Sequence, residues 1–417
     1  MRITLLAATM AISLNVSAQA VNDVVSIGAT YTDQVWYSLQ NDEQGTAPKN
    51  NWDLAFDVST MGSTVLINSV TGTTLWKYPK NDTAGWASID TNGLSTWHAH
   101  WNSDTSWTYG AIGRYANPAN PFDFDWGVYD LTTHSVIGDS LYIVQLANGD
   151  FKKLWIQSIV GTIISFKYAN LDGSSTQYAT FDKSLYPGKN FGYYSLQSNT
   201  SSDREPVSNN WDLLFTQHTA FVPTPYTVTG VLSNKGVQVA KRDNDANYLT
   251  DNTYSTASFN IAINTIGHDW KRFTGTSYAV QDSLLYFVKC KNGDIWKLIF
   301  TGFEGSSTGN YLFSKEKLLT ASAVPQTNAS ASNSLVLYPN PATTSSLNIV
   351  YDLATAQPST TLNVFDVTGK TVYTTTAPGA AGLHVFNLPA NLQLQSGMYI
   401  VTLSSENYTN KQTLIIQ

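Results

Sequence analysis

The sequence predicts an all-β protein that contains two similar β-rich domains and a small C-terminal immunoglobulin-like β-sandwich. Short apolar runs alternate with turn residues along most of the chain, which is typical of strands. No segment keeps a 3.6-residue apolar period over more than about two turns, so long helices are not expected. The middle of the chain also repeats itself. With 417 residues and 42% hydrophobic residues, the chain is long enough for several hydrophobic cores.

The charge, the length of the apolar runs and the cysteine count exclude several classes of binding partner and site. The net charge is −7 and only 13% of residues are charged, and no basic block is present, so we expect no nucleic-acid partner. No segment after the N-terminus has about 18 consecutive apolar residues, so we expect no transmembrane segment. Cys290 is the only cysteine, which excludes an intrachain disulfide and indicates a buried, inert thiol.

Residues 1–20 have the pattern of a secretory signal peptide. Arg2 provides a short positive region, and residues 3–16 are mostly apolar but too short to span a bilayer. Small residues follow, with cleavage expected after Ala18 or Ala20. We therefore expect a mature protein that is exported from the cytoplasm.

A tandem duplication accounts for the body of the chain, with one copy at residues 22–187 and the other at 188–321. Four motifs recur in the same order: Tyr-Ser-Leu-Gln at 37–40 and 194–197, Asn-Asn-Trp-Asp-Leu at 50–54 and 209–213, Asp-Ser-Leu at 139–141 and 282–284, and Asn-Gly-Asp at 148–150 and 292–294. Repetition of four motifs in one order indicates two copies of one domain.

Each copy is expected to be all-β. Residues 141–156 and 284–300 both place an Asn-Gly turn between β-rich runs, which is a strong hairpin signal because both turn residues need a positive φ. Trp52 and Trp211 lie in apolar alternations and are predicted core residues. The duplicated Asp53 and Asp212 that follow them are expected to cap turns rather than to perform chemistry.

The two copies resemble the HmuY-like family of haem-binding proteins from Bacteroidetes. The resemblance rests on three motifs: Asn-Trp-Asp-Leu-x-Phe at 51–56 and 210–215, Trp-x-x-Tyr/Phe at 126–129 and 270–273, and the hairpins that contain Lys153-Leu154 and Lys297-Leu298. The resemblance implies β-rich domains that hold haem between two axial histidines and pass it to a receptor.

The haem ligands that the family implies are not preserved here. One ligand is expected a few residues after Trp126 or Trp270, and neither stretch contains histidine. His134 is the nearest histidine to that position, and its axial partner would be His98 or His100. We therefore expect weak or no specific haem binding, and the cofactor remains open.

Residues 94–109 offer two other binding hypotheses. If this segment is a strand, His98 and His100 share one face with Cβ atoms about 6–7 Å apart. That spacing suits two ligands of one divalent metal, with a third such as Asp104, although a packed pair in a loop is the alternative. The nearby Trp97, Trp101 and Trp107 are a candidate stacking platform for a sugar or another planar ligand, or the core and rim of one sheet.

Catalytic signatures are absent from the sequence. It contains no Gly-x-Ser-x-Gly, no His-Glu-x-x-His and no phosphate-binding loop. We therefore expect a non-catalytic binding protein that is secreted or held at the outer cell surface. The alternative is a surface adhesin or carbohydrate-binding β-protein.

Residues 322–334 are small and polar and predict a linker. Residues 335–417 then contain short alternating strands between turns, which predict a β-sandwich of about 80 residues.

This C-terminal segment resembles the type A sorting domain of the type IX secretion system of Bacteroidetes. Its matching positions include Tyr338, Pro339, Asn340 and Pro341, the strand and turn at 364–370, Gly397, Tyr399 and Lys411. The resemblance implies export by the type IX machinery, removal of the domain by its sortase, and attachment of the protein to surface lipopolysaccharide.

Overall fold

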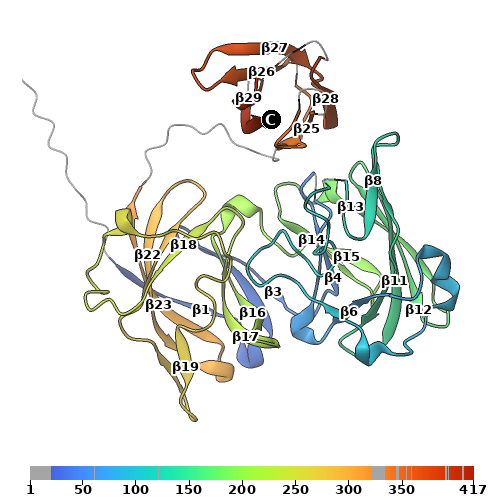
Figure 1. The fold of residues 1–417 in the computed structure, drawn as a ribbon. Helices are drawn as coiled ribbons and strands as arrows, with labels where there is room; N and C mark the ends of the chain where they lie inside the picture. Colours follow the sequence, from blue (N-terminus) through green and yellow to red (C-terminus); the bar gives the residue numbers. More distant parts are fainter. Residues whose placement is uncertain are drawn as a thin grey trace, which may run out of the picture.

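The computed structural model describes most of the chain: residues 20–60, 62–120, 122–320, 334–343, 347–353, 355–357, 359–389, 392, 394–405 and 408–417. The predicted signal peptide, except Ala20, and the predicted linker, except Ser334, lie outside the described residues. The described elements are strands and short 3-10 turns, which confirms the all-β prediction. They include no helix that is long and apolar enough to cross a membrane. Figure 1 shows two β-rich lobes side by side and a smaller sandwich above them.

The first lobe packs two antiparallel sheets around one core. The larger sheet has the order β13 (Gln177–Asp182), β12 (Ile163–Asn170), β11 (Phe151–Val160), β10 (Tyr142–Gln145), β6 (Thr74–Lys77) and β7 (Ala99–His100), with β8 (Gly127–Asp130) and β9 (Ser135–Gly138) at its side. The smaller sheet has the order β15 (Thr200–Ser202), β14 (Phe191–Ser195), β4 (Leu54–Asp57) and β5 (Val65–Ile67). Phe56, Trp126 and Phe166 are fully buried between the sheets.

The second lobe has the same plan. Its larger sheet has the order β1 (Val21–Ser26), β23 (Asn310–Leu319), β22 (Ile295–Phe303), β21 (Leu285–Lys289) and β18 (Gln238–Arg242). Its smaller sheet has the order β17 (Pro225–Ser233), β16 (Leu213–Phe221), β2 (Asp33–Ser38) and β3 (Asp42–Pro48), and a hairpin of β19 (Lys271–Phe273) and β20 (Tyr278–Val280) is added. Trp270 is buried at the position that Trp126 occupies in the first lobe.

Each lobe is completed by strands from the other sequence repeat. Strands β1, β2 and β3 open the first repeat, yet β1 pairs with β23 and β2 pairs with β16. Strands β14 and β15 open the second repeat, yet β14 pairs with β4. The first lobe therefore comprises residues 49–202, and the second joins residues 20–48 to 203–320. The predicted bounds 22–187 and 188–321 describe units of sequence, whereas the lobes are divided near residues 48 and 202.

Hydrogen bonds to the two duplicated Asp residues link each repeat to the strands it receives from the other repeat. Asp53, just before β4, accepts a hydrogen bond at 2.7 Å from the Leu196 amide in the turn after β14. Asp212, just before β16, accepts one at 2.9 Å from the Leu39 amide in the turn after β2. Both Asp residues thus hold a Tyr-Ser-Leu-Gln turn from the other repeat, in agreement with the expected turn-capping role. The Asn-Asn-Trp-Asp-Leu motif of each repeat thus contacts the Tyr-Ser-Leu-Gln motif of the other, which gives a physical reason why both motifs occur in both repeats.

The C-terminal segment is a separate β-sandwich, as the sequence predicts. One sheet has the order β24 (Ser334–Tyr338), β25 (Asn348–Leu353) and β28 (Gly382–Asn387). The other has the order β27 (Thr371–Ala377), β26 (Thr360–Asp366), β29 (Gly397–Ser405) and β30 (Tyr408–Ile416). Tyr351, Val364 and Val401 are fully buried between them.

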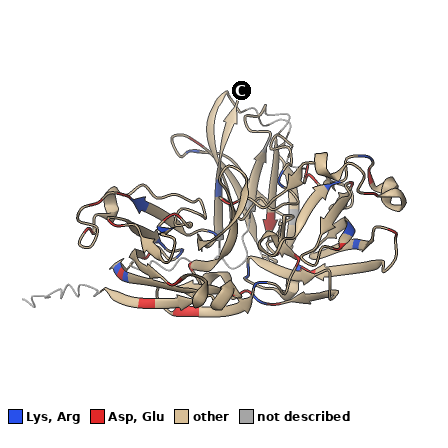
Figure 2. Cartoon of the chain, turned by 90° about the horizontal axis from the view of Figure 1, so that it is seen from below, with Lys and Arg blue, Asp and Glu red and all other residues tan. Residues whose placement is uncertain are grey.

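Charged side chains are sparse over the described chain. Figure 2 shows them as isolated blue and red positions on largely uncharged ribbons. Several form ion pairs, such as Lys77 with Asp125 at 3.1 Å and its counterpart Lys241 with Asp269 at 2.9 Å.

We expect Asp53→Ala to destabilise the protein by roughly 3 kcal/mol, because it leaves two buried and two part-buried donors without an acceptor. These donors are Ser195 Oγ, the amides of Leu196 and Gln197, and Gln197 Nε2. Thermal or denaturant unfolding measures the change. Asp203→Ala is the control, since Asp203 is exposed and pairs with Lys189 at the surface, where such pairs contribute about 0–1 kcal/mol. Equal stability of the two variants would contradict the assigned role of Asp53.

Candidate functional site

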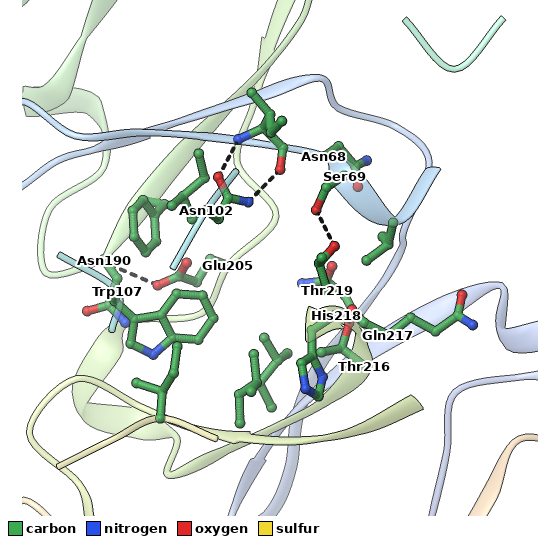
Figure 3. A pocket seen from close by; sticks show the side chains of 18 of the residues that line it. Asn68, Ser69, Asn102, Trp107, Asn190, Glu205, Thr216, Gln217, His218 and Thr219 are labelled. Carbon is green, nitrogen blue, oxygen red and sulfur yellow. Dashed lines mark hydrogen bonds between the residues drawn. The ribbon is translucent and has the colours of Figure 1, made fainter. Parts of the chain in front are cut away.

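A cavity of about 100 Å³ lies between the two lobes. Its walls come from the outer faces of the two smaller sheets and from the loop around Trp107. Figure 3 shows Asn68, Glu205, Trp107 and His218 around this space. The cavity therefore uses residues from both lobes.

Equivalent residues of the two sequence repeats line the cavity from the two lobes. Trp52 and Trp211 precede the equivalent strands β4 and β16 and both line it. Leu66 and Leu232 are a second pair, because each lies opposite an equivalent residue of those strands. Trp211 is buried, as predicted, whereas Trp52 is half-buried and packs beside Tyr193 with ring centroids 5.2 Å apart. The two tryptophans thus lie at the lobe interface, apart from the main core of either lobe.

Trp107 joins the two walls. It belongs to the first lobe, yet its indole Nε1 donates to the Ser233 carbonyl of the second lobe at 2.8 Å. Its ring also packs against Phe191, with centroids 5.9 Å apart. One aromatic side chain therefore contacts both apolar clusters that face the cavity.

Polar contacts hold the lobes together around the cavity. The Ser69 and Thr219 hydroxyls are hydrogen-bonded at 2.8 Å. Asn190 Nδ2 donates to Asn234 Oδ1 at 2.7 Å. Lys235 Nζ and Asp57 Oδ2 form an ion pair at 2.9 Å. These contacts fix the separation of the walls.

Unpartnered polar atoms gather at this cavity. Among the described residues, fourteen buried side-chain nitrogen and oxygen atoms lack a hydrogen-bond partner. Five belong to cavity residues: Nε1 of Trp52, Nε1 of Trp211, Oδ1 of Asn68, and both ring nitrogens of His218. Buried polar groups are normally paired, so this concentration distinguishes the cavity residues from the rest of the described chain.

His218 lies on β16 beside His268, with ring centroids 6.2 Å apart. Burial is the main cause that lowers the pKa of His218 to about 3, and the charges of His268 and Lys271 add to it. His218 is therefore neutral at pH 7, with one nitrogen that donates and one that accepts.

Glu205 is a buried carboxyl at the same interface. Its Oε1 accepts from the Asn190 amide at 2.8 Å, and its Oε2 accepts from the Tyr193 hydroxyl at 2.9 Å. Burial outweighs these bonds and raises the pKa of Glu205 to about 7. The adjacent Arg204 guanidinium lies over the rings of Trp36, Trp52 and Tyr193, at 4.9–5.9 Å from their centroids.

The structure brings His98 and His100 together, with ring centroids 5.8 Å apart. His98 is exposed and its Nε2 lies 2.9 Å from the Tyr115 hydroxyl. His100 is buried, and its Nδ1 donates to the Ala111 carbonyl at 3.2 Å. Asp104, the suggested third metal ligand, lines the interlobe cavity instead. Within the described part of the chain, no group of three or more His, Cys, Asp and Glu residues could hold a metal ion.

His134 lies elsewhere on the first lobe, in the exposed turn between β8 and β9. Its φ is +53°, and its Nδ1 lies 3.1 Å from the Tyr129 hydroxyl. None of the described contacts of His134 joins it to His98 or His100. The pairing of His134 with His98 or His100 as axial haem ligands therefore stays a prediction.

The three candidate stacking tryptophans are dispersed. Trp97 packs edge-on against Tyr78, with centroids 5.6 Å apart. The Trp101 carbonyl accepts from Arg114 at 2.9 Å. Of the three, Trp107 alone lines the interlobe cavity. The segment from 101 to 126 is largely irregular, so it does not align their rings as a strand would.

Sequence reasoning missed His218, Glu205 and the pairing of Trp52 with Trp211 across a cavity. His218 and Glu205 belong to no recurring motif, so repeat analysis does not mark them. The recurrence of Trp52 and Trp211 was visible, but the sequence does not show that the two copies face each other.

The sorting-domain residues hold the ends of the C-terminal sandwich together. Asn340 Nδ2 donates to the Thr413 carbonyl at 2.7 Å, and its Oδ1 accepts from the Ile415 amide at 2.9 Å. Asn340 thereby ties the segment of Tyr338, Pro339 and Pro341 to β30, which carries the exposed Lys411. Gly397 begins β29, where the Tyr399 hydroxyl donates to the Gln395 carbonyl at 2.9 Å.

Comparison with known families identifies the C-terminal part of the chain. Residues 336–417 match the secretion system C-terminal sorting domain. This confirms the predicted type IX sorting domain, and the protein is therefore a secreted or outer-surface protein that interacts with the type IX machinery. No curated protein matches the chain.

Solved structures give weak similarities. PorZ, a surface component of the type IX secretion system of Porphyromonas gingivalis, is 10% identical with a TM-score of 0.16 over 77% of this chain. Latent PorU of Porphyromonas gingivalis is 10% identical with a TM-score of 0.17 over 85% of this chain. The chain spans half the length of PorZ and 31% of PorU. These scores assign no known fold to the two lobes, and the HmuY-like resemblance stays a prediction.

The raised pKa of Glu205 predicts a pH-dependent stability. Between pH 4.5 and about 7 the folded protein keeps a proton on Glu205 that the unfolded chain has lost. The free energy of unfolding therefore falls as the pH rises through this window, by roughly 3 kcal/mol from this one group.

Glu205→Gln should remove this component of the slope, as measured by denaturant unfolding at several pH values. Glu43→Gln is the control, because Glu43 is exposed on β3 and should leave the slope unchanged. An unaltered slope in Glu205→Gln would show that Glu205 is ionised in the folded protein at neutral pH.

Proposed function

We propose that this type IX-exported protein is a non-catalytic binding protein that holds a small ligand between its two lobes. The observation that carries the proposal is the interlobe cavity, which the duplicated Trp52 and Trp211 both line and where five buried polar atoms of lining residues lack partners. A concave, mostly apolar site with a few polar groups is typical of ligand pockets.

The chemistry of the cavity favours binding over catalysis. Glu205 is engaged by two donors, the Asn190 amide and the Tyr193 hydroxyl. His218 has no acceptor that would orient it as a general base, whereas catalytic bases are normally held by a third group. The buried Cys290 thiol has its pKa raised by burial, so it is a poor nucleophile at neutral pH.

Haem is not the ligand that this cavity favours. His218 is the single histidine that lines it, whereas the haem-binding family is expected to use two axial histidines. A cavity of about 100 Å³ is smaller than the roughly 150 Å³ that holds one benzene molecule, so it does not enclose a porphyrin macrocycle. Weak or no haem binding therefore remains our expectation.

A second candidate function is adhesion through a carbohydrate-binding surface. Partly buried aromatic residues gather on the first lobe beside Tyr78, Leu141 and Ile143; they are Trp76, Trp86, Trp97, Phe151 and Trp155. Partly exposed tryptophan offers both an apolar face and a polar edge to a sugar. This cluster favours adhesion as the alternative to a cavity ligand.

Sortase removal of the C-terminal sandwich and attachment to lipopolysaccharide are also proposals. They follow from the similarity of residues 336–417 to the sorting domain. In this scheme the two lobes would remain at the cell surface after the sandwich is removed.

Deletion of residues 335–417 should block export, because it removes the sorting domain and leaves the two lobes complete. Protease treatment of intact cells measures surface exposure of the chain, and cell fractionation measures its retention in the periplasm. The control is the full chain in cells with and without the type IX machinery. Surface display of the truncated chain would contradict the proposed export route.

Ligand binding itself is testable because the cavity contains four tryptophans, Trp36, Trp52, Trp107 and Trp211. Tryptophan fluorescence of the full chain should change with at least one ligand class in a panel of neutral sugars, amino acids, nucleosides and ferric haem. The response should weaken in Trp107→Ala and persist in Trp97→Ala, which alters a tryptophan outside the cavity. A panel without any response dependent on Trp107 would contradict cavity binding.

A further inference from the structure

We propose that the interlobe cavity recognises a neutral polyhydroxylated ligand, namely the terminal sugar unit of a glycan. This inference rests on the proposed function and names the ligand class of the same site. The hydroxyl groups of the sugar would pair with Trp52, Trp211, Asn68 and His218.

The unpartnered atoms of the cavity residues include both hydrogen-bond donors and acceptors, so a matching ligand needs groups that can donate and accept. The indole nitrogens of Trp52 and Trp211 can only donate, and Oδ1 of Asn68 can only accept. The neutral His218 ring has one donor and one acceptor, and neither has a partner. A hydroxyl donates one hydrogen bond and accepts others, so adjacent hydroxyls on one ring satisfy this mixed set.

The charges around the cavity exclude an anion as the favoured ligand. Its lining residues include no lysine and no arginine, whereas Asp104 and Glu205 are acidic. Lys49 and Lys235 lie nearby, but Lys49 donates to Gln217 and Lys235 pairs with Asp57. The Arg204 guanidinium is also nearby, because it lies over the rings of Trp36, Trp52 and Tyr193, but it does not line the cavity. A carboxylate or phosphate in the cavity would therefore lose its hydration without a direct ion pair to a lining lysine or arginine.

A cationic ligand is disfavoured for a different reason. The aromatic faces of Trp36, Trp52 and Tyr193 would suit an ammonium group, but the Arg204 guanidinium already lies over all three. A second cation there would be repelled by Arg204. A neutral ligand needs no ion-pair partner in the cavity and is not repelled by Arg204.

The size of the cavity limits how much of a sugar it can enclose. The cavity volume is about 100 Å³, smaller than the roughly 150 Å³ that holds one benzene molecule. It therefore admits part of a ring, with C–H groups against the aromatic walls. Ser69, Gln217 and Thr219 are half-buried lining residues that offer polar contacts to the part left outside. This arrangement fits the end of a glycan chain.

The experiment is a calorimetric titration of the full chain with three groups of probes. The first is a set of neutral methyl glycosides of glucose, galactose, mannose and N-acetylglucosamine. The second is methyl glucuronide, which keeps the pyranose ring and its ring hydroxyls and carries a carboxylate, and the third is toluene, which keeps only an apolar ring. We expect at least one neutral methyl glycoside to bind, methyl glucuronide to bind about 10-fold more weakly than that glycoside or not at all, and toluene not to bind.

Two variants locate the binding. His218→Phe and Trp211→Phe each remove ring nitrogens while keeping an aromatic ring, and each should weaken glycoside binding about 10-fold. Trp296→Phe is the matched control, because Trp296 also has a buried, unpartnered indole nitrogen but does not line the cavity. Should Trp211→Phe fail to fold, His218→Phe remains a sufficient test.

The outcomes separate the two proposals. Binding of toluene or methyl glucuronide in preference to every neutral glycoside, with loss in the cavity variants, would overturn the inference of a neutral sugar and keep the cavity as a binding site. Equal glycoside binding by His218→Phe, Trp211→Phe and the Trp296→Phe control would also overturn it, because the sugar would then bind elsewhere. Failure of every ligand class, including those of the fluorescence panel, would overturn the proposed function itself.

Discussion

The exchange of strands between the two sequence repeats is the constraint on which the body of this protein depends. Each smaller sheet is completed by two strands from the other repeat, which join it through the pairings β2 with β16 and β14 with β4. Asp53 and Asp212 secure these pairings by accepting backbone hydrogen bonds from the turns that follow the exchanged strands. Neither lobe could keep its smaller sheet without the other repeat. The two lobes are therefore parts of one interlocked unit.

This interlocking explains where the cavity lies. The chain crosses between the lobes twice, near residues 48 and 202, and Arg204 donates to the Pro48 carbonyl where the crossings meet. The equivalent smaller sheets are thereby held face to face, so duplicated residues such as Trp52 and Trp211 oppose each other. A duplicated framework supplies the walls, whereas unduplicated side chains such as His218 and Trp107 would give the proposed site its selectivity among ligands.

The sequence predicted the features that local patterns control. Alternating strands and Asn-Gly turns indicated an all-β chain, the motif around Asn340 indicated the sorting domain, and the recurrence of Asp53 and Asp212 indicated a turn-capping role. Strand exchange was not predictable, because a repeated motif shows which segments are equivalent but not which copy each one joins. The cavity was missed for the same reason. The predicted grouping of Trp97, Trp101 and Trp107 assumed a regular strand, whereas that segment is mostly loop.

The most direct test of this account is hydrogen exchange on the full chain and on a chain without residues 20–48. The account predicts that this deletion leaves the amides of β4 to β15 protected, because the first lobe keeps all its strands. It also predicts rapid exchange in β16, β17, β22 and β23, which lose their partners β1 and β2 or the core that these strands complete. Undiminished protection of both lobes, or loss of protection in both alike, would contradict the strand exchange described here.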